Sequence, residues 1–214
     1  MVKKMVNNIF MLYGAHDIKF KYGLKNFKNC IDQFKTIVRK NKLKYKDIIS
    51  IIENSIIDPI PIGINPKTSP EDYVRKKTEL EKLLLETFLK KKETFFSTII
   101  KKFRGKSEGH DDFSFQLMNF LKNKKTIIVF EENNCEVIKK YVEYENKSVE
   151  ETLIRILKSS HEVDNMRDEL MVNQIKQLSY KHPDKNFVIV RGSLHNKLSD
   201  YLKQSGFDVS DYTY

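Results

Sequence analysis

The chain of 214 residues has little cysteine and no long apolar run. Its two cysteines, Cys30 and Cys135, lie far apart in sequence, so they do not form the framework of a small disulfide-bonded domain, and a reducing compartment is expected. The basic N-terminus, MVKKMVNNIFMLYGAH, has two asparagines within its apolar run, which is unlike a signal peptide or a membrane span. We therefore expect a cytoplasmic protein without a transmembrane segment.

Acidic residues are the scarcer charged class. Lys and Arg number 39 against 29 Asp and Glu, which gives a formal net charge of +10. Such a balance favours contact with nucleic acid, an anionic membrane surface or acidic ligands. The excess is mostly lysine in dispersed runs (40–46, 90–92, 101–106 and 122–125) and forms no arginine motif. This pattern indicates either a solvated lysine surface or weak, non-specific binding of nucleic acid.

Four short apolar runs have the length of β-strands, and they cover residues 9–13, 126–130, 187–190 and 207–209. They are nearly uninterrupted, which is typical of strands buried on both faces of a parallel sheet. The long region between the first two runs has helical spacing. These patterns predict an α/β fold, a single domain over 1–214 with a central, mostly parallel sheet and flanking helices. A helical insertion or lid is expected over about 24–122, between the first two core strands.

Capping signals place several helix boundaries. The isoleucine pairs between 48 and 57 continue the helical pattern, and a loop follows. Ser69 predicts the N-cap of a new helix, with Pro70 in its first turn and Asp72 at the capping-box position. The same spacing of Ser and Glu predicts two helices between 149 and 179, and Gly206 is expected to end the last helix.

Polar residues follow directly after three of the predicted strands. In an open α/β sheet, ligands bind at the carboxyl ends of the strands, so these residues are candidates for a site. Two histidines and at least one carboxylate are expected to converge there if the strands are parallel neighbours. The three segments are Gly14-Ala15-His16-Asp17, Glu131-Glu132 and Gly192-Ser193-Leu194-His195.

Two imidazoles and a carboxylate permit two kinds of chemistry. His16, Glu131 and His195 form the donor set of a catalytic divalent metal such as Mn, Co or Zn, and they would equally serve as general acid and base without a metal. Because successive side chains of a strand point to opposite faces, only one of Glu131 and Glu132 is expected to enter the site. The remaining substrate-binding candidates are Asp17, which could orient His16, with Glu132, Gly14 and Gly192.

The motif residues resemble those of the TraB/PrgY, TIKI and ChaN group, a clan that also includes the erythromycin esterases. The best match is the C-terminal part, NMRDELMVNQIKQL followed by NFVIVRGSLHNKLSDYLKQSGFDV. The group is similar in having an early glycine-histidine strand end, an internal strand that ends in Glu, an Arg-Asp helix and a late GxxH strand. The matching residues are Gly14, His16, Glu131, Arg167, Asp168, Met171, Gly192 and His195. By its position in this pattern, the resemblance implies that Glu131 rather than Glu132 enters the site.

This resemblance implies an α/β fold with a polar site, but it does not define one reaction, because the group includes metal-dependent proteases, ester hydrolases and haem binders. Within the matched motif, Arg167 is expected to hold an anionic group or to stabilise developing negative charge. Three functions remain open. They are a hydrolase, with or without a metal, acting on an ester or amide of a small molecule or peptide; a non-catalytic carrier of a haem-like ligand; and a basic nucleic-acid-binding or interaction protein with a vestigial site.

Overall fold

The computed structural model describes residues 7–14, 20–52, 110–132, 134–137, 152–192 and 197–214, together with residues 69, 71, 72, 74–76, 78, 79, 82, 85 and 86. The chain divides into two compact units. The first, here called the sheet unit, comprises Met1–Ile56, Gly109–Glu132 and Arg167–Tyr214; the second comprises Ile57–Glu108 and Asn133–Met166.

A five-stranded, all-parallel sheet forms the centre of the sheet unit, which confirms the expected α/β fold. The strand order is β3-β2-β4-β1-β5. The strands are β1 (Asn8–Gly14), β2 (Ile48–Ile52), β3 (Ile127–Phe130), β4 (Asn186–Gly192) and β5 (Asp208–Thr213). The helices are α1 (Phe20–Lys40), α4 (His110–Asn123), α6 (Thr152–Lys181) and α7 (Lys197–Gln204), with a 3-10 turn at Tyr45–Asp47.

The structure has a strand, β2, where the sequence predicts a helix. Its segment, IISII, is expected to continue a helix, but the structure places it between β3 and β4 with all five residues buried. A strand buried on both faces has no apolar period, so isoleucine pairs suit either element, and β-branched side chains favour the strand. The range 24–122 thus contributes α1, β2 and α4 to the sheet unit, while residues 53–68 and 87–109 lie outside the described residues.

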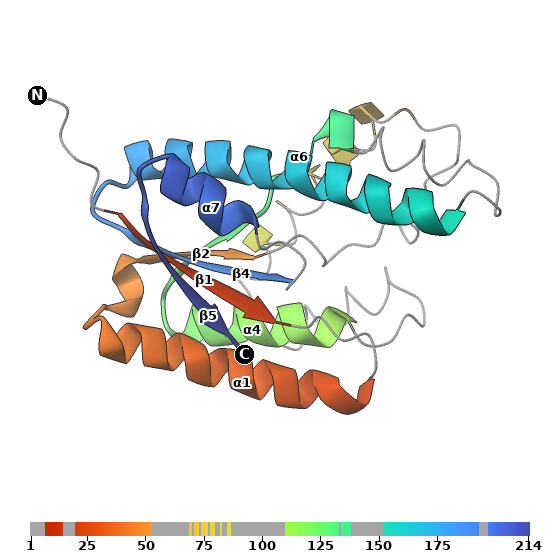
Figure 1. Cartoon of the computed structure of the whole chain (residues 1–214). Helices are drawn as coiled ribbons and strands as arrows, with labels where there is room; N and C mark the ends of the chain where they lie inside the picture. Colours follow the sequence, from red (N-terminus) through yellow and green to blue (C-terminus); the bar gives the residue numbers. More distant parts are fainter. Residues whose placement is uncertain are drawn as a thin grey trace, which may run out of the picture. The chain divides into compact units, whose positions relative to one another are not determined.

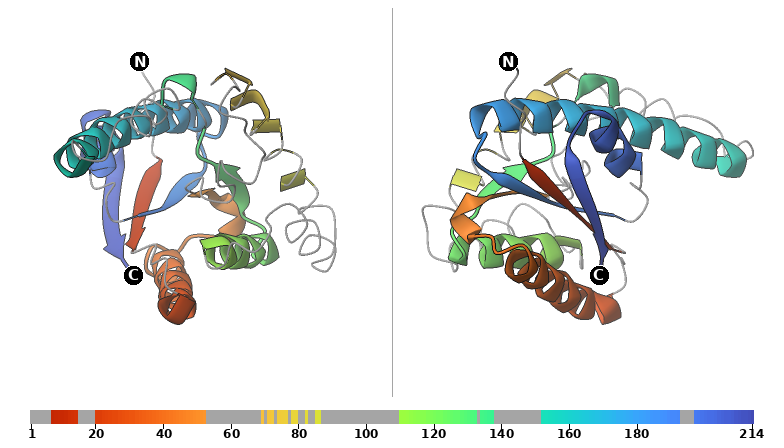
Figure 2. Two further views of the ribbon diagram at one scale, coloured as in Figure 1. Left: turned by 90° about the vertical axis from the view of Figure 1, so that its right-hand side faces the viewer. Right: turned by 60° about the vertical axis from the view of Figure 1, so that its left-hand side comes forward.

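Helices cover both faces of the sheet (Figure 1). Helices α1 and α4 lie on one face, and α7 and the part of α6 that belongs to the sheet unit lie on the other, as the two turned views also show (Figure 2). The connections from β1 to β2 and β3 cross the sheet in one direction, and those from β3 to β4 and β5 return in the other. Because crossovers are right-handed, the two directions place their helices on opposite faces.

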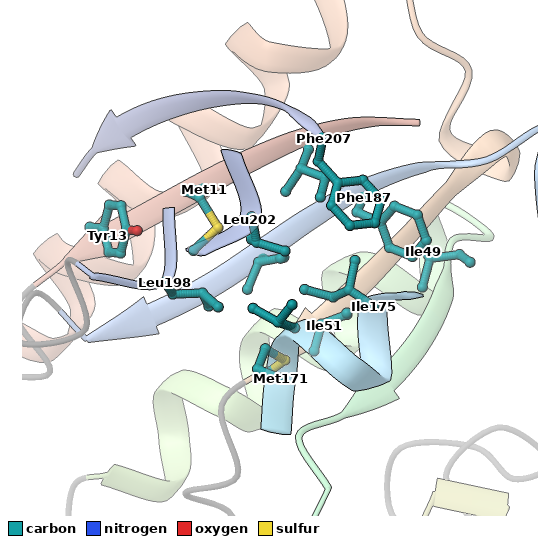
Figure 3. Close-up of a cluster of buried hydrophobic side chains, with 13 residues drawn as sticks. Met11, Tyr13, Ile49, Ile51, Met171, Ile175, Phe187, Leu198, Leu202 and Phe207 are labelled. Carbon is teal, nitrogen blue, oxygen red and sulfur yellow. The ribbon is translucent and has the colours of Figure 1, made fainter. Parts of the chain in front are cut away.

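Two apolar layers follow from the alternation of side chains along the strands. The layer under α6 and α7 includes Met11, Ile49, Phe187, Met171 and Leu202 (Figure 3). Under α1 and α4, buried side chains come from both helices, and Phe34 meets Phe120 edge-on at 5.7 Å between ring centroids. These layers hold the strand ends in a defined register.

The predicted caps are confirmed where the structure describes them. Ser69 Oγ accepts a hydrogen bond from the amide of Asp72 at 3.2 Å, and the described residues from Glu71 to Glu86 are helical. Gly206, two residues after the last residue of α7, adopts a left-handed φ of 86°, as a helix-ending glycine should. Where two helices are expected between 149 and 179, residues 152–179 lie in one helix, α6, and residues 149–151 lie outside the described residues.

None of the helices, as far as their residues are described, is long and apolar enough to cross a membrane. Cys30 is buried and Cys135 is partly buried, and both are free thiols.

Candidate functional site

The carboxyl ends of the neighbouring strands β1 and β4 lie side by side. The two strands are parallel neighbours, and Gly14 is the register partner of Gly192. The chain then leaves β1 towards α1 on one face and leaves β4 towards α7 on the other (Figure 1). Adjacent strand ends whose connections diverge in this way are the position at which open α/β sheets bind ligands.

Both predicted histidines follow this pair of glycines. His16 comes two residues after Gly14, and His195 comes three residues after Gly192. The side chains of His16, Asp17 and His195 lie outside the described residues, so the structure establishes only the strand ends from which these residues depart. The two ends are adjacent, in register and at the same edge of the sheet, which is the geometry that the convergence of His16 and His195 requires.

Next to these strand ends lies a buried group of charged side chains, here called the arginine–carboxylate cluster. It consists of Glu131 after β3, Arg167 and Asp168 on α6, and Arg191 on β4. Arg167 donates to Glu131 from Nε to Oε1 at 3.0 Å and from Nη2 to Oε2 at 2.7 Å. Arg191 donates from Nη2 to Glu131 Oε1 at 3.0 Å and from Nη1 to Asp168 Oδ1. Two positive and two negative groups therefore balance one another.

Strand alternation brings the members of the arginine–carboxylate cluster together. Ile127 and Val129 of β3 pack in the layer under α6 and α7, so Glu131, two residues on, points to the same face. Phe187 and Ile189 of β4 pack in the same layer, so Arg191, which follows Ile189 by two residues, also points to this face. Arg167 and Asp168 then approach from α6.

The four residues of the arginine–carboxylate cluster differ in their exposure to solvent. Arg191 is 0% exposed, Asp168 is 2% exposed and Glu131 is 6% exposed. The side chain of Arg167 is 17% exposed and is the part of the cluster that solvent can reach. Glu132 is exposed, as alternation leads one to expect for the residue next to a buried Glu131.

The hydrogen bonds of Glu131 bear on whether it can hold a metal. Three guanidinium N–H groups already point at its two carboxylate oxygens. Within the described ranges, no group of three or more His, Cys, Asp or Glu side chains is arranged to hold a metal ion. Among the described residues, the arrangement suits a carboxylate that orients two arginines, while the other two predicted metal ligands, His16 and His195, lie outside the described residues.

Arg191, to which the sequence patterns assign no role, is the largest fully buried side chain among the described residues. The available signal is its position in FVIVRG, where it continues the inward-facing series of Phe187 and Ile189. A charged residue on the inward side of a buried strand needs a buried partner, and Asp168 and Glu131 supply it.

Gly14 has a neighbour that sequence analysis does not predict. A Cβ atom added at Gly14 would lie 2.1 Å from ring carbons of Tyr214, which is closer than any real contact. The Tyr214 amide also donates to the carbonyl of Tyr13 at 3.0 Å, which continues the pairing of β5 with β1. Gly14 is needed here for space: among the described glycines, the left-handed conformation is found at Gly206.

Comparison of the chain with protein-family models, with curated proteins and with solved structures finds no match in any of the three.

Proposed function

We propose that this chain is a hydrolase of ester or amide bonds that reacts where β1 and β4 end. The observation that carries the proposal is the register pair of Gly14 and Gly192, because it starts both histidine segments from one place in the sheet. Imidazoles near neutral pH can accept and donate a proton in turn. In this proposal His16 and His195 are the general base that activates water and the general acid that protonates the leaving group.

Arg167 supplies the positive charge in this proposal. Its guanidinium is the most exposed member of the arginine–carboxylate cluster, and its bidentate pair with Glu131 holds its plane in one orientation. A fixed cation of this kind can bind an anionic part of a substrate or stabilise negative charge that develops on an oxygen. Glu131 then acts through Arg167, as a positioning residue.

Asp168 and Arg191 help to hold the Glu131 carboxylate that orients Arg167. Their buried pair adds a second guanidinium to Glu131 Oε1, so Glu131 is held from the strand side as well as from the helix side. A site group that is locked by packing and by such secondary hydrogen bonds keeps its geometry during reaction. No step in this scheme passes through a metal.

The test is hydrolysis of a panel of carboxylic esters and peptides by the parent, by His195→Ala and by His182→Ala. His182 is a matched control because it lies in the turn before β4, at the opposite end of that strand. We expect His195→Ala to lower kcat/KM at least about 100-fold, the usual contribution of acid–base assistance, and His182→Ala to hydrolyse like the parent.

Each assay is run with added Mn²⁺, Co²⁺ or Zn²⁺ and again with a chelator. Equal rates in both support the acid–base scheme, whereas a strict requirement for one ion would replace it with metal-assisted hydrolysis. A parent protein that hydrolyses no member of the panel, or a His195→Ala variant as active as the parent, would overturn the proposal.

A further inference from the structure

The hydroxyl of Tyr13 is buried without a hydrogen-bond partner among the described residues. Tyr13 is 9% exposed and lies near the carboxyl end of β1 (Figure 3). Buried tyrosine hydroxyls nearly always find a partner, because a polar group that has lost its bonds to water otherwise raises the free energy of the folded state. An unsatisfied hydroxyl beside a candidate site therefore requires an explanation.

The position of Tyr13 connects it with both the strand ends and α7. Tyr13 directly precedes Gly14, and its register partner is Arg191 of the arginine–carboxylate cluster. Its side chain belongs to the same buried layer as Leu198 of α7, and the backbone amide of Ser199 in the first turn of that helix lies near the phenol oxygen. First-turn amides have no acceptor within their own helix. The hydroxyl thus lies beside the amino-terminal end of α7.

The charges around Tyr13 decide which role its hydroxyl can take. Burial, with added repulsion from the carboxylates of Asp211 and Asp168, raises the pKa of the Tyr13 phenol above its ordinary value. Asp168 is paired with Arg191, and Asp211 accepts hydrogen bonds from Ser199 Oγ at 2.9 Å and Lys203 Nζ at 3.0 Å. The phenol therefore keeps its proton at neutral pH and is available as a hydrogen-bond donor.

We infer that the Tyr13 hydroxyl and the first-turn amides of α7 form a subsite for a carboxyl oxygen. During reaction the bound atom is the carbonyl oxygen of the ester or amide, and afterwards it belongs to the carboxylate of the acid product. The inference rests on the proposed function for the first role, whereas binding of a carboxylate can be measured without turnover. Two donors that converge on an oxygen stabilise the negative charge that the oxygen gains as the carbonyl is attacked.

Tyr13→Phe is the decisive variant because it removes only the hydroxyl. Since the hydroxyl bonds to none of the described residues, we expect the Tm to stay the same or to rise. Loss of one donor to a developing oxyanion should lower kcat about 100- to 1,000-fold with little change in KM. Tyr45→Phe is the control, because Tyr45 stacks on Phe34, in the layer under α1 and α4.

A second readout uses acetate, butyrate and benzoate as probes of the product's carboxylate. These anions should raise the Tm of the parent and of Tyr45→Phe in proportion to the logarithm of their concentration, and the rise should be absent in Tyr13→Phe. If the parent hydrolyses nothing and yet loses its carboxylate-dependent Tm shift in Tyr13→Phe, the subsite stands and the hydrolase proposal falls.

Two results would overturn the inference. One is a Tyr13→Phe variant with a clearly lowered Tm, which would make the hydroxyl a structural group. The other is a Tyr13→Phe variant that keeps both the parent's kcat and its carboxylate-dependent Tm shift, in which case the hydroxyl binds an ordered water only.

Discussion

The ring of Tyr214 occupies the space in which any side chain at position 14 would begin, so Gly14 and Tyr214 are matched across β1 and β5. This relationship gives the glycine of the first histidine motif a steric role. A side chain at position 14 would require the ring of Tyr214 to move.

A double-mutant cycle tests this match. Gly14→Ala should lower the free energy of unfolding by about 1–3 kcal/mol, because overpacking forces the ring or the strand to shift. In a Tyr214→Ala background the same change should cost much less, with a coupling of about 0.5–3 kcal/mol from urea unfolding. Tyr212→Ala is the control background: its ring packs near Phe10, and equal coupling there would refute the match.

Among the charged residues that the structure describes, Arg191 is expected to be the most sensitive to substitution. Arg191→Met removes a guanidinium that binds both Asp168 and Glu131, which leaves two buried carboxylates without it, and should cost about 3–5 kcal/mol of unfolding free energy. Arg75→Met is the control, since Arg75 pairs with Asp72 and Glu79 at an exposed position, and it should leave the stability close to that of the parent. Similar losses for the two variants would show that burial of Arg191 contributes nothing.

Glu131→Gln separates a positioning carboxylate from a metal ligand. The amide keeps the shape but weakens the bidentate bond to Arg167, so kcat/KM on the best substrate should fall about tenfold or more. Affinity for Mn²⁺ or Zn²⁺, measured by isothermal titration calorimetry, should match that of the parent. Replacing a residue that only orients a metal ligand usually lowers metal affinity about 10- to 100-fold. If Glu131→Gln lowers the affinity for Mn²⁺ or Zn²⁺ by that factor or more, Glu131 is part of a metal site.

Because of two buried groups, the Cys30 thiol and the Tyr13 phenol, we expect the free energy of unfolding to fall at alkaline pH. Burial raises the pKa of the Cys30 thiol above its ordinary value of 9.0, and burial with nearby carboxylates raises that of Tyr13 above 10.0. Each group releases its proton more readily in the unfolded chain, so its contribution is complete below the unfolded pKa and is lost as pH rises towards the folded one. The slope is about 1.4 kcal/mol per pH unit for each group.

Single variants assign the two parts of this alkaline loss. Cys30→Ala should flatten the curve of unfolding free energy against pH from about pH 9, whereas Tyr13→Phe should flatten it only above about pH 10. Urea unfolding at intervals of half a pH unit measures both curves. If Cys30→Ala falls as steeply as the parent between pH 9 and 10, the thiol does not control that window.

The sequence by itself predicted the elements whose signals are local. Uninterrupted apolar runs located β1, β3, β4 and β5, and the capping residues Ser69 and Gly206 marked helix boundaries that the structure confirms. Such signals are readable because strand burial, capping and a left-handed φ depend on a few neighbouring residues. The same local logic failed for β2, since IISII has no period that separates a buried strand from a buried helix.

Only the tertiary structure decided which of these elements meet. The pairing of β1 with β4 brings Gly14 next to Gly192 across 178 positions, and no local pattern encodes that strand order. The same holds for Arg191: its place on an inward face is visible in FVIVRG, but its partners are Glu131, which follows another strand, and Asp168, which lies on a helix. Contacts between distant segments depend on how whole elements pack, which is why the arginine–carboxylate cluster and the match of Gly14 with Tyr214 emerge only from the fold.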